Sequence, residues 1–391
     1  MRSALPRSVI VLGWVSFLND LASEMVTPLI PILLAGLAAG PVALGAIEGC
    51  ADAVAAFFRL WAGRNSDRIA GRRKALTVAG YALSNAVRPL FSMAFHWAAL
   101  LVLRSIDRIG KGLRSAPRDA MVADMVQAHQ RGAAFGVQRA FDNSGAVLGA
   151  LVAALVLWQF TGDVATVIAY SALPGLLAVA LVGVAVREPV RRTSVESLPP
   201  LSWSALAAQQ RRVLMIVGVF TFARVSDTFI VLRGYQLGLG VVELLVLWAA
   251  MNLMKAGSAY LGGGWSDRAS RRIVLLVSWT AWAAGLWLLC TADTRLSLWL
   301  VAMYVGVASG LGEGAERALV RDFARGAEIG TAFGWYYFLT GLAAIPAGIV
   351  FGALWQWQSA AFAFSFAGGV AASCAFSLLM LVKGPGIRRG D

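Results

Sequence analysis

The sequence predicts an all-α membrane protein of 12 transmembrane helices, arranged as two six-helix halves, and three observations support this. Of its 391 residues, 59% are hydrophobic and 14% are charged, whereas soluble domains are about 45–50% apolar and about 25% charged. The apolar residues gather in long stretches, and the second half of the chain repeats motifs of the first. Despite a net charge of +13, this composition argues against a soluble enzyme, a disordered chain and a nucleic-acid-binding domain.

Twelve apolar stretches are each long enough for a helix that crosses a bilayer, which needs ~20 residues. We expect them at 8–36, 42–63, 75–95, 97–126, 131–160, 164–186, 212–238, 242–263, 272–291, 296–322, 328–356 and 358–382. The first is too long, and is followed by too many others, for a cleaved signal peptide. The connection at 187–211 carries three prolines and several charges, which is typical of a linker. We therefore predict a six-helix half at 1–186, a cytoplasmic linker at 187–211 and a second half at 212–391.

The basic residues indicate the orientation of the chain. Twenty-one of the 34 Lys and Arg residues lie in the termini and in the connections expected at one end of the helices, whereas the connections at the opposite end hold Arg295. Cytoplasmic loops of membrane proteins carry an excess of Lys and Arg. We therefore expect both termini in the cytoplasm and a multi-pass protein of the cytoplasmic (inner) membrane.

The two halves share short motifs. GRNSDRIAGRRKAL at 63–76 matches GGWSDRASRRIVLL at 263–276, so that the triplet SDR at 66–68 recurs at 266–268. Farther along, AMVAD at 120–124 matches ALVRD at 318–322, and GAAFG at 132–136 matches GTAFG at 330–334. A duplicated six-helix unit is typical of a transporter whose binding site lies between the repeats, near the middle of the bilayer.

GRNSDRIAGRRKAL resembles the loop 2–3 signature of the major facilitator superfamily, roughly GxxxDRxGRRxxL, and the shortened copy near 263–273 lies where that family repeats it. Arg104 in the fourth stretch fits the family's helix 4 arginine, and Gly110 and Gly112 follow it. The resemblance covers the whole chain and implies 12 spans with both termini inside and transport by alternating access. It does not indicate a substrate, because the fold carries sugars, drugs, peptides, siderophores and inorganic anions.

Two runs of small residues, SGAVLGA at 144–150 and GLAAIPAG at 341–348, favour close helix packing. The first lies where the family's drug/proton antiporters have a GxxxGPxxGG-like signature, but it lacks the proline.

The loop signature also implies a gate. By resemblance, a latch between the halves is formed by Gly63, Asp67, Arg68, Gly71 and Arg72, with Asp267 and Arg268 in the second copy. A carboxylate at position 67 can pair with the arginines that follow or face the N-terminus of a neighbouring helix. The alternative is that these charges only retain the loop in the cytoplasm, which explains the arginines but not the acid.

Charged residues also occur inside the stretches, where each one that faced lipid would cost ~2.5–3.5 kcal/mol. At about 100° per residue, seven of them share one face of the fourth stretch: Arg104, Asp107, Arg108, Lys111, Arg114, Arg118 and Asp119. Asp20 and Glu24 are i,i+4 neighbours in the first stretch, and Arg224 and Asp227 are i,i+3 neighbours in the seventh. Helices 1, 4, 7 and 10 line the cavity in the family that this chain resembles, so these charges are expected along a central polar pathway.

Three roles remain open for these residues. Guanidinium groups suit carboxylate or phosphate, which makes Arg104, Asp107, Arg108, Lys111 and Arg224 candidates for substrate binding. Low-dielectric surroundings favour the neutral form of a carboxyl group, which makes Asp20, Glu24 and Asp227 candidates for proton coupling. In the third role, acids and bases only neutralise one another. We expect this for Arg118–Asp119 and the aligned Glu316–Arg317, as charge pairs that cross the interface between the halves.

The favoured function is a secondary active transporter that moves a small organic solute with an anionic group, coupled to protons, with efflux favoured over import. The alternatives are a proton-coupled or facilitative importer of a metabolite or siderophore, a membrane-embedded lipid-modifying enzyme and a non-transporting receptor. The chain has no GxxxxGK[ST], HExxH or GxSxG motif, and its three cysteines lack metal-ligand spacing. We expect no enzyme activity, cofactor, metal or nucleic-acid partner. The expected partners are the lipid bilayer, a small-molecule substrate and protons, and the expected state is a monomer.

Overall fold

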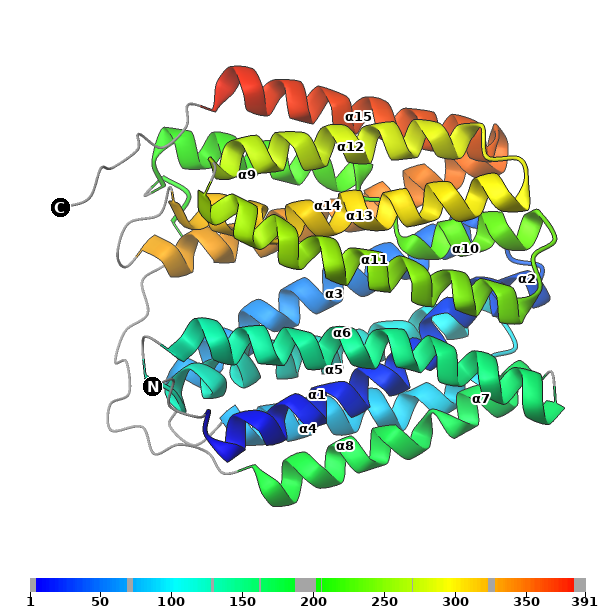
Figure 1. Ribbon diagram of the computed structural model, residues 1–391, viewed down its shortest axis with the longest axis horizontal. Coiled ribbons are helices and arrows are strands. Elements are labelled where there is room, and N and C mark those ends of the chain that lie inside the picture. The colour runs from blue at the N-terminus through cyan, green and yellow to red at the C-terminus, as the bar shows by residue number, and fades with distance from the viewer. Residues whose placement is uncertain are drawn as a thin grey trace.

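The structure is a computed structural model that describes residues 5–68, 73–127, 130–161, 163–186, 202–204, 206–268, 270–322 and 328–382. Within these ranges, the side chains of 67–68, 160–161, 267–268 and 328–330 lie outside the description. The described residues form helices and connecting turns, and no strand occurs among them. The helices lie along the long axis of the molecule, and α1 begins and α15 ends at the same end of it (Figure 1).

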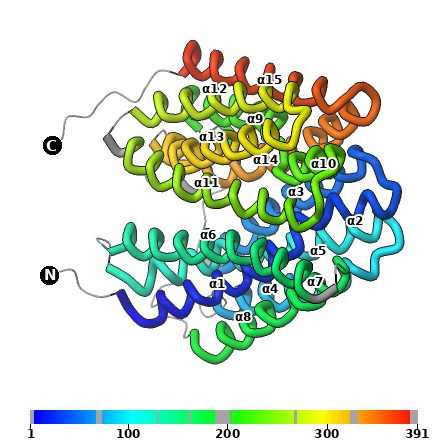
Figure 2. Tube along the Cα trace, turned by 45° about the vertical axis from the view of Figure 1, so that its right-hand side comes forward, coloured from blue at the N-terminus to red at the C-terminus, as the bar shows by residue number. Residues whose placement is uncertain are grey.

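Two groups of helices follow one another along the chain and lie side by side in space (Figures 1 and 2). The first group consists of α1 (Arg7–Val26), α2 (Ile30–Gly36), α3 (Pro41–Arg68), α4 (Arg73–Val87), α5 (Trp97–Asp124), α6 (Arg131–Val156), α7 (Val164–Tyr170) and α8 (Ala172–Ala185). The second group consists of α9 (Ala208–Phe220), α10 (Asp227–Gln236), α11 (Val241–Arg268), α12 (Arg271–Cys290), α13 (Arg295–Asp322), α14 (Glu328–Trp357) and α15 (Ala360–Leu381). The groups meet where α3 packs against α14 and α6 packs against α11.

Several of the expected stretches are broken helices. In the first, the 3₁₀ turn Thr27–Leu29 separates α1 from α2, because Pro28 and Pro31 have no N–H with which to continue the α-helical hydrogen bonds. In the seventh, α9 ends in a 3₁₀ turn at Thr221–Ala223, and α10 starts again behind the N-cap Ser226. The third stretch likewise passes from α4 into the 3₁₀ turn Arg88–Met93.

Ten helical stretches in the described part of the chain are long and apolar enough to cross a membrane. The other two expected spans differ for separate reasons. Helix α4 has 15 residues before its 3₁₀ extension, and α5 has 28 residues but carries the charged face. Because α5 packs against α3 and α4, much of that charge faces protein instead of lipid.

The two runs of small residues lie at close helix contacts, as expected. A Cβ atom on Gly45 of α3 would overlap the carbonyl group of Gly348 of α14. Gly145 and Gly149 of α6 likewise lie against the backbone of α1. Glycine at these positions therefore sets the distance between the paired helices.

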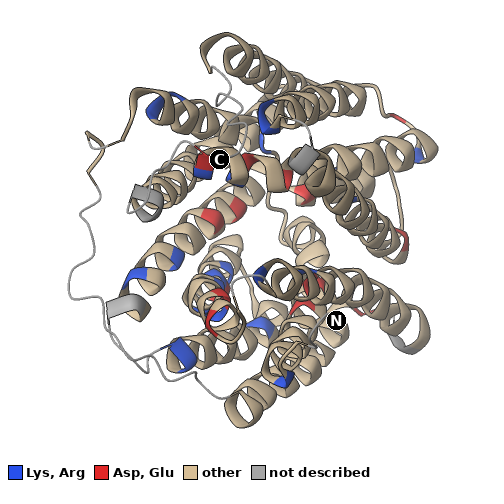
Figure 3. Cartoon of the chain, turned by 60° about the vertical axis from the view of Figure 1, so that its left-hand side comes forward, with Lys and Arg blue, Asp and Glu red and all other residues tan. Residues whose placement is uncertain are grey.

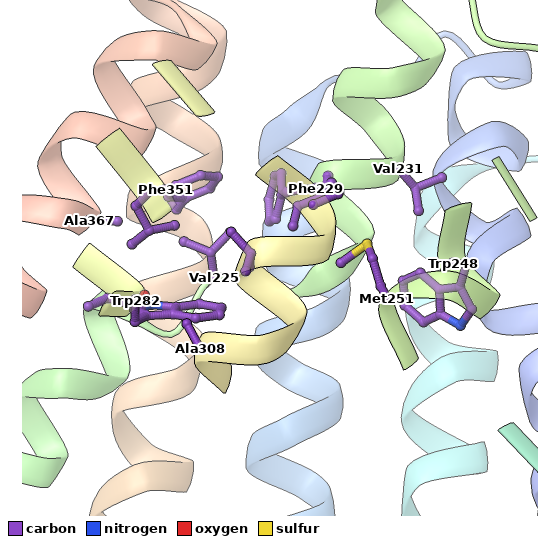
Figure 4. Close-up of a cluster of buried hydrophobic side chains, with 14 of the residues drawn as sticks. Val225, Phe229, Val231, Trp248, Met251, Trp282, Ala308, Phe351 and Ala367 are labelled. Carbon is purple, nitrogen blue, oxygen red and sulfur yellow. Dashed lines mark hydrogen bonds between the residues drawn. The ribbon is translucent and has the colours of Figure 1, made fainter. Parts of the chain in front are cut away.

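The second group has an apolar interior (Figure 4). Phe229 of α10 packs edge-on against Phe351 of α14, with ring centroids 4.7 Å apart. Val225, Trp282 and Ala308 are buried in the same cluster. This close packing holds the helices of the second group rigidly where they face the first group.

Candidate functional site

A cavity of about 430 Å³ lies between the two groups of helices. Its lining comes from α1, α3 and α5 of the first group and from α9 to α14 of the second. Helix segments with charged residues, blue and red in Figure 3, occur near the centre of the molecule. Twelve charged residues line the cavity: Glu24, Glu48, Asp52, Asp227, Glu313, Glu316, Arg104, Arg108, Lys111, Arg224, Lys255 and Arg317.

The break between α9 and α10 places two of the predicted residues. Arg224 follows the 3₁₀ turn with a non-helical ψ of 74°, and Asp227 is the first residue of α10. The expectation that they are neighbours on one helical face is therefore wrong, because no helix runs between them. Arg224 Nη2 instead donates to both carboxylate oxygens of Glu316, at 2.9 and 2.7 Å, and Asp227 lies 3.8 Å from Lys255 Nζ.

The charged face of α5 divides into two environments. Arg104 lines the cavity but is only 2% exposed, and its guanidinium lies 3.4 Å from Glu48 and 3.7 Å from Asp107. Asp107 is buried inside the first group, does not line the cavity, and lies 3.2 Å from Arg88 Nε. Arg104 and Asp107 thus belong to a neutralised buried cluster, and Asp107 is not in reach of a ligand in the cavity.

Arg108 and Lys111 have a different setting. They are one turn apart on α5, and both line the cavity. Neither side chain forms a hydrogen bond or an ion pair with a described residue, and Arg108 Nε is buried without a hydrogen-bond partner. Among the described residues, no carboxylate therefore lies within ion-pair distance of either cation.

The three carboxylates predicted for proton coupling are placed differently from one another. Glu24 lines the cavity and accepts a hydrogen bond of 2.8 Å from Trp248 Nε1, across the interface between the groups. Asp227 lines the cavity beside Lys255. Asp20 accepts a hydrogen bond of 3.0 Å from Asn19 and is not among the lining residues.

The predicted charge pairs between the halves are not formed across the interface. Arg118 lies 3.0 Å from Asp119 and 3.3 Å from Asp142, both in the first group. Glu316 pairs with Arg224, and Arg317 lies 3.3 Å from Glu313, all in the second group. Each side chain finds an opposite charge within its own group, so the prediction of a crossing pair at these positions is wrong.

Among the described residues, the ion pair that crosses the interface joins Arg139 of α6 to Glu313 of α13, at 3.4 Å. Both residues lie inside expected stretches, at 131–160 and 296–322, but the sequence carries no signal that would pair them. Arg139 is about half exposed, so this contact is open to water.

The predicted latch lies largely beyond the described contacts. Asp67, Arg68, Asp267 and Arg268 end α3 and α11, but their side chains are outside the description, and Gly71 and Arg72 are outside the described residues. Gly63 packs on Ala116 of α5. Immediately after each loop, the first arginine of the next helix pairs with an aspartate: Arg73 with Asp124, and Arg271 with Asp322.

All the aromatic residues of the lining belong to the second group: Phe220, Trp248, Trp279, Trp282 and Tyr336. Each is less than a tenth exposed. From the sequence, a substrate-facing role for Tyr336 is an alternative to the favoured helix packing, and the other four residues are not selected. The available signal for these is the i,i+3 spacing of Trp279 and Trp282 on a single helical face.

Two groups of membrane-crossing helices with a charged cavity between them define a secondary transporter. The family model of the Major Facilitator Superfamily matches residues 12–263, and the chain belongs to that superfamily. An uncharacterized MFS-type transporter of Methanocaldococcus jannaschii is 27% identical over 365 residues, which cover 90% of this chain and 89% of that protein. The protein is therefore a multi-pass membrane transporter and not an enzyme.

Two solved structures show the same fold at low sequence identity. The nucleoside transporter NupG aligns with a TM-score of 0.77 and 13% identity, covering 96% of this chain and 100% of that chain. A D-xylose-proton symporter aligns with a TM-score of 0.73 and 17% identity, covering 96% and 97%. At such identities the likeness extends to the fold and not to the substrate.

Proposed function

We propose that the protein moves a small organic solute with an anionic group through the central cavity by alternating access. The observation that carries this proposal is the pair Arg108 and Lys111, two lining cations that have no carboxylate of a described residue at ion-pair distance. Every other lining cation has a carboxylate within 4 Å: Arg104 has Glu48, Arg224 has Glu316, Lys255 has Asp227 and Arg317 has Glu313. A bound anion would place a negative group in direct contact with this pair, and a guanidinium suits carboxylate or phosphate.

We further propose that transport is coupled to protons at the lining carboxylates Glu24 and Asp227, with Asp20 one turn before Glu24 on α1. Glu24 is bonded to the opposite group through Trp248, so a change in its charge acts on a contact between the groups. Asp227 is held by a single cation at 3.8 Å. Protonation of either acid would release a partner that then becomes available to the substrate or to the other group.

The orientation proposal rests on the positive-inside rule. Helices α1, α4, α6, α9 and α12 begin, and α13 and α15 end, at the same end of the bundle (Figure 1). Basic residues occupy these helix ends: Arg73, Lys74, Arg131, Arg211, Arg212, Arg271, Arg272 and Arg321. We propose that this end faces the cytoplasm and that the chain lies in the inner membrane. Since one chain encloses the whole cavity, we propose a monomer, and export stays our predicted direction.

A transport assay tests the proposal. The first step selects organic anions that raise the melting temperature of the purified protein. Each selected anion is then added to proteoliposomes that contain the protein and carry a pH gradient of one sign or the other. We expect the solute to accumulate against its concentration gradient with only one sign of the pH gradient. That sign shows whether protons move with the solute or in the opposite direction. Arg108→Gln and Lys111→Gln should lose this accumulation, whereas Arg212→Gln, which removes the same charge from an exposed site on α9, should keep it. Equal transport of the neutral amide of the same solute would contradict the anion site, and accumulation that survives an ionophore would contradict proton coupling.

A further inference from the structure

The cavity has chemically different walls on its two sides, and this difference concerns the apolar part of the substrate. Each group supplies six charged lining residues, but the first includes Arg108 and Lys111, which have no ion pair with a described residue, and the second supplies all five aromatic side chains. We infer that the substrate is an aromatic organic anion, whose charged group lies against α5 and whose ring lies against α9, α11 and α12. This inference rests on the proposed function and adds the chemical class of the substrate.

The five aromatic lining residues, called the aromatic wall below, are held in place by packing. Phe220 of α9 stacks on Trp279 of α12, with ring centroids 4.0 Å apart and ring planes 7° from parallel. Trp282, one turn farther along α12, is 6% exposed. Because the neighbours fix these rings, a ligand that packs on them meets a preorganised surface and need not order it.

The polar atoms of three of these side chains are already bonded within the protein. Trp248 Nε1 donates to Glu24 and Trp282 Nε1 donates to the carbonyl oxygen of Ala223, both at 2.8 Å. The hydroxyl of Tyr336 donates to Glu316 at 2.7 Å. What these side chains still offer a ligand is ring surface, which favours an apolar partner and, by its quadrupole, another ring.

The charges on this side of the cavity are mutually satisfied. Arg224 and Glu316 form a two-oxygen contact beside the aromatic wall, and Asp227 has Lys255. A ligand's charged group therefore gains most on the side of α5. Asp52 and Glu24 also line the cavity from the first group, so a ligand that carries an amine as well is the alternative that the experiment must separate.

A ligand series on the unmodified protein tests the inference. The probes are 3-phenylpropanoate, its cyclohexyl analogue 3-cyclohexylpropanoate, propanoate, 3-phenylpropanamide and phenylalanine, with Kd obtained from the melting temperature as a function of concentration. We expect 3-phenylpropanoate to bind at least about tenfold more tightly than the amide, since a hydrogen bond to a charged group is lost. It should bind about two- to tenfold more tightly than the cyclohexyl analogue, since ring–ring contacts add to the buried area, and more tightly than propanoate or phenylalanine.

The outcomes separate this inference from the proposed function. If 3-cyclohexylpropanoate or propanoate binds as tightly as 3-phenylpropanoate, the aromatic inference is wrong, and the proposed anion site is not affected. Equal binding of the amide overturns the anion site itself. Tighter binding of phenylalanine overturns the inference in favour of a zwitterion, and absence of any shift with 3-phenylpropanoate also overturns it.

Variants of Trp282 give an independent reading. Trp282→Leu should reduce the ratio of phenyl to cyclohexyl affinity towards one, whereas Trp282→Phe, which keeps a ring, should preserve it. Trp287→Leu on the same helix is the matched control, because Trp287 is 47% exposed and does not line the cavity. The ratio compares two ligands on one protein, so a general loss of stability does not move it. A ratio unchanged in Trp282→Leu contradicts the placement of the ring.

Discussion

The indole Nε1–H of Trp248 on α11 donates a hydrogen bond of 2.8 Å to Oε2 of Glu24 on α1, and this bond joins the two groups of helices at the wall of the cavity. Glu24 lies one turn before the break between α1 and α2. Movement of the first group relative to the second must stretch or break this contact. The pair can therefore couple the protonation of the Glu24 carboxyl group to the position of one group of helices relative to the other.

Removal of the donor should weaken this connection. Trp248→Phe deletes a hydrogen bond to a carboxylate, which is worth about 1.5–3 kcal/mol, and should lower the melting temperature of the purified protein. Glu24→Gln keeps an acceptor and should lower it less. Trp158→Phe changes an indole that is 72% exposed and serves as the control. An equal decrease in Trp158→Phe and Trp248→Phe would show that the bond adds nothing.

Arg104 and Arg108 lie one turn apart on α5. Loss of charge should lower the stability of the protein at Arg104 and the affinity for an anion at Arg108. Arg104→Gln leaves Glu48 buried without its cation, and breaking such a pair costs about 3–5 kcal/mol. Arg108→Gln breaks no ion pair with a described residue, so the melting temperature of this variant should stay near that of the parent, while the affinity for an organic anion falls. Melting curves with and without 3-phenylpropanoate measure both effects. A stable Arg104→Gln protein would contradict the structural role of the buried pair.

This contrast shows how far the sequence could define the site. Helical periodicity correctly placed Arg104, Arg108 and Lys111 on the cavity face of α5, because a continuous helix fixes the direction of its side chains. It could not divide that face into paired and unpaired cations. The division depends on Glu48 and Arg88, which lie on other helices, and helix packing is not encoded in the periodicity of one segment.

The internal repeat predicted the backbone better than the chemistry. Helices α3 and α11 have bounds 200 residues apart, and α5 and α13 have bounds 198 residues apart. At equivalent positions, however, Glu48 corresponds to Trp248, and Arg104 corresponds to the buried Ala302. A duplicated fold requires only matching helix lengths and packing residues, so one copy can hold charges where the other holds aromatic rings. For this reason the repeat gave no indication that Trp248 lines the cavity.

The repeated pairs Arg73–Asp124 and Arg271–Asp322 should each stabilise the contact between two neighbouring helices. Both pairs are partly exposed, so the expected coupling energy is about 0.5–1 kcal/mol. A double-mutant cycle with Arg73→Gln and Asp124→Asn isolates this energy, and the same cycle on Arg271 and Asp322 gives the second value. Both energies should shrink in high salt, which screens exposed charges. Additive single effects in either cycle would contradict the pairing.

The contact of α3 with α14 should tolerate no side chain at Gly45. Gly45→Ala places a methyl group into the carbonyl of Gly348, and overpacking of this kind typically costs about 1–3 kcal/mol. The two helices must then separate, so we expect a lower melting temperature together with slower transport in proteoliposomes. Gly257→Ala on α11 is the matched control, since nothing lies within 4 Å of its Cβ position and alanine is the better helix former. If Gly45→Ala matched Gly257→Ala in both assays, the close approach of α3 and α14 would not be required for transport.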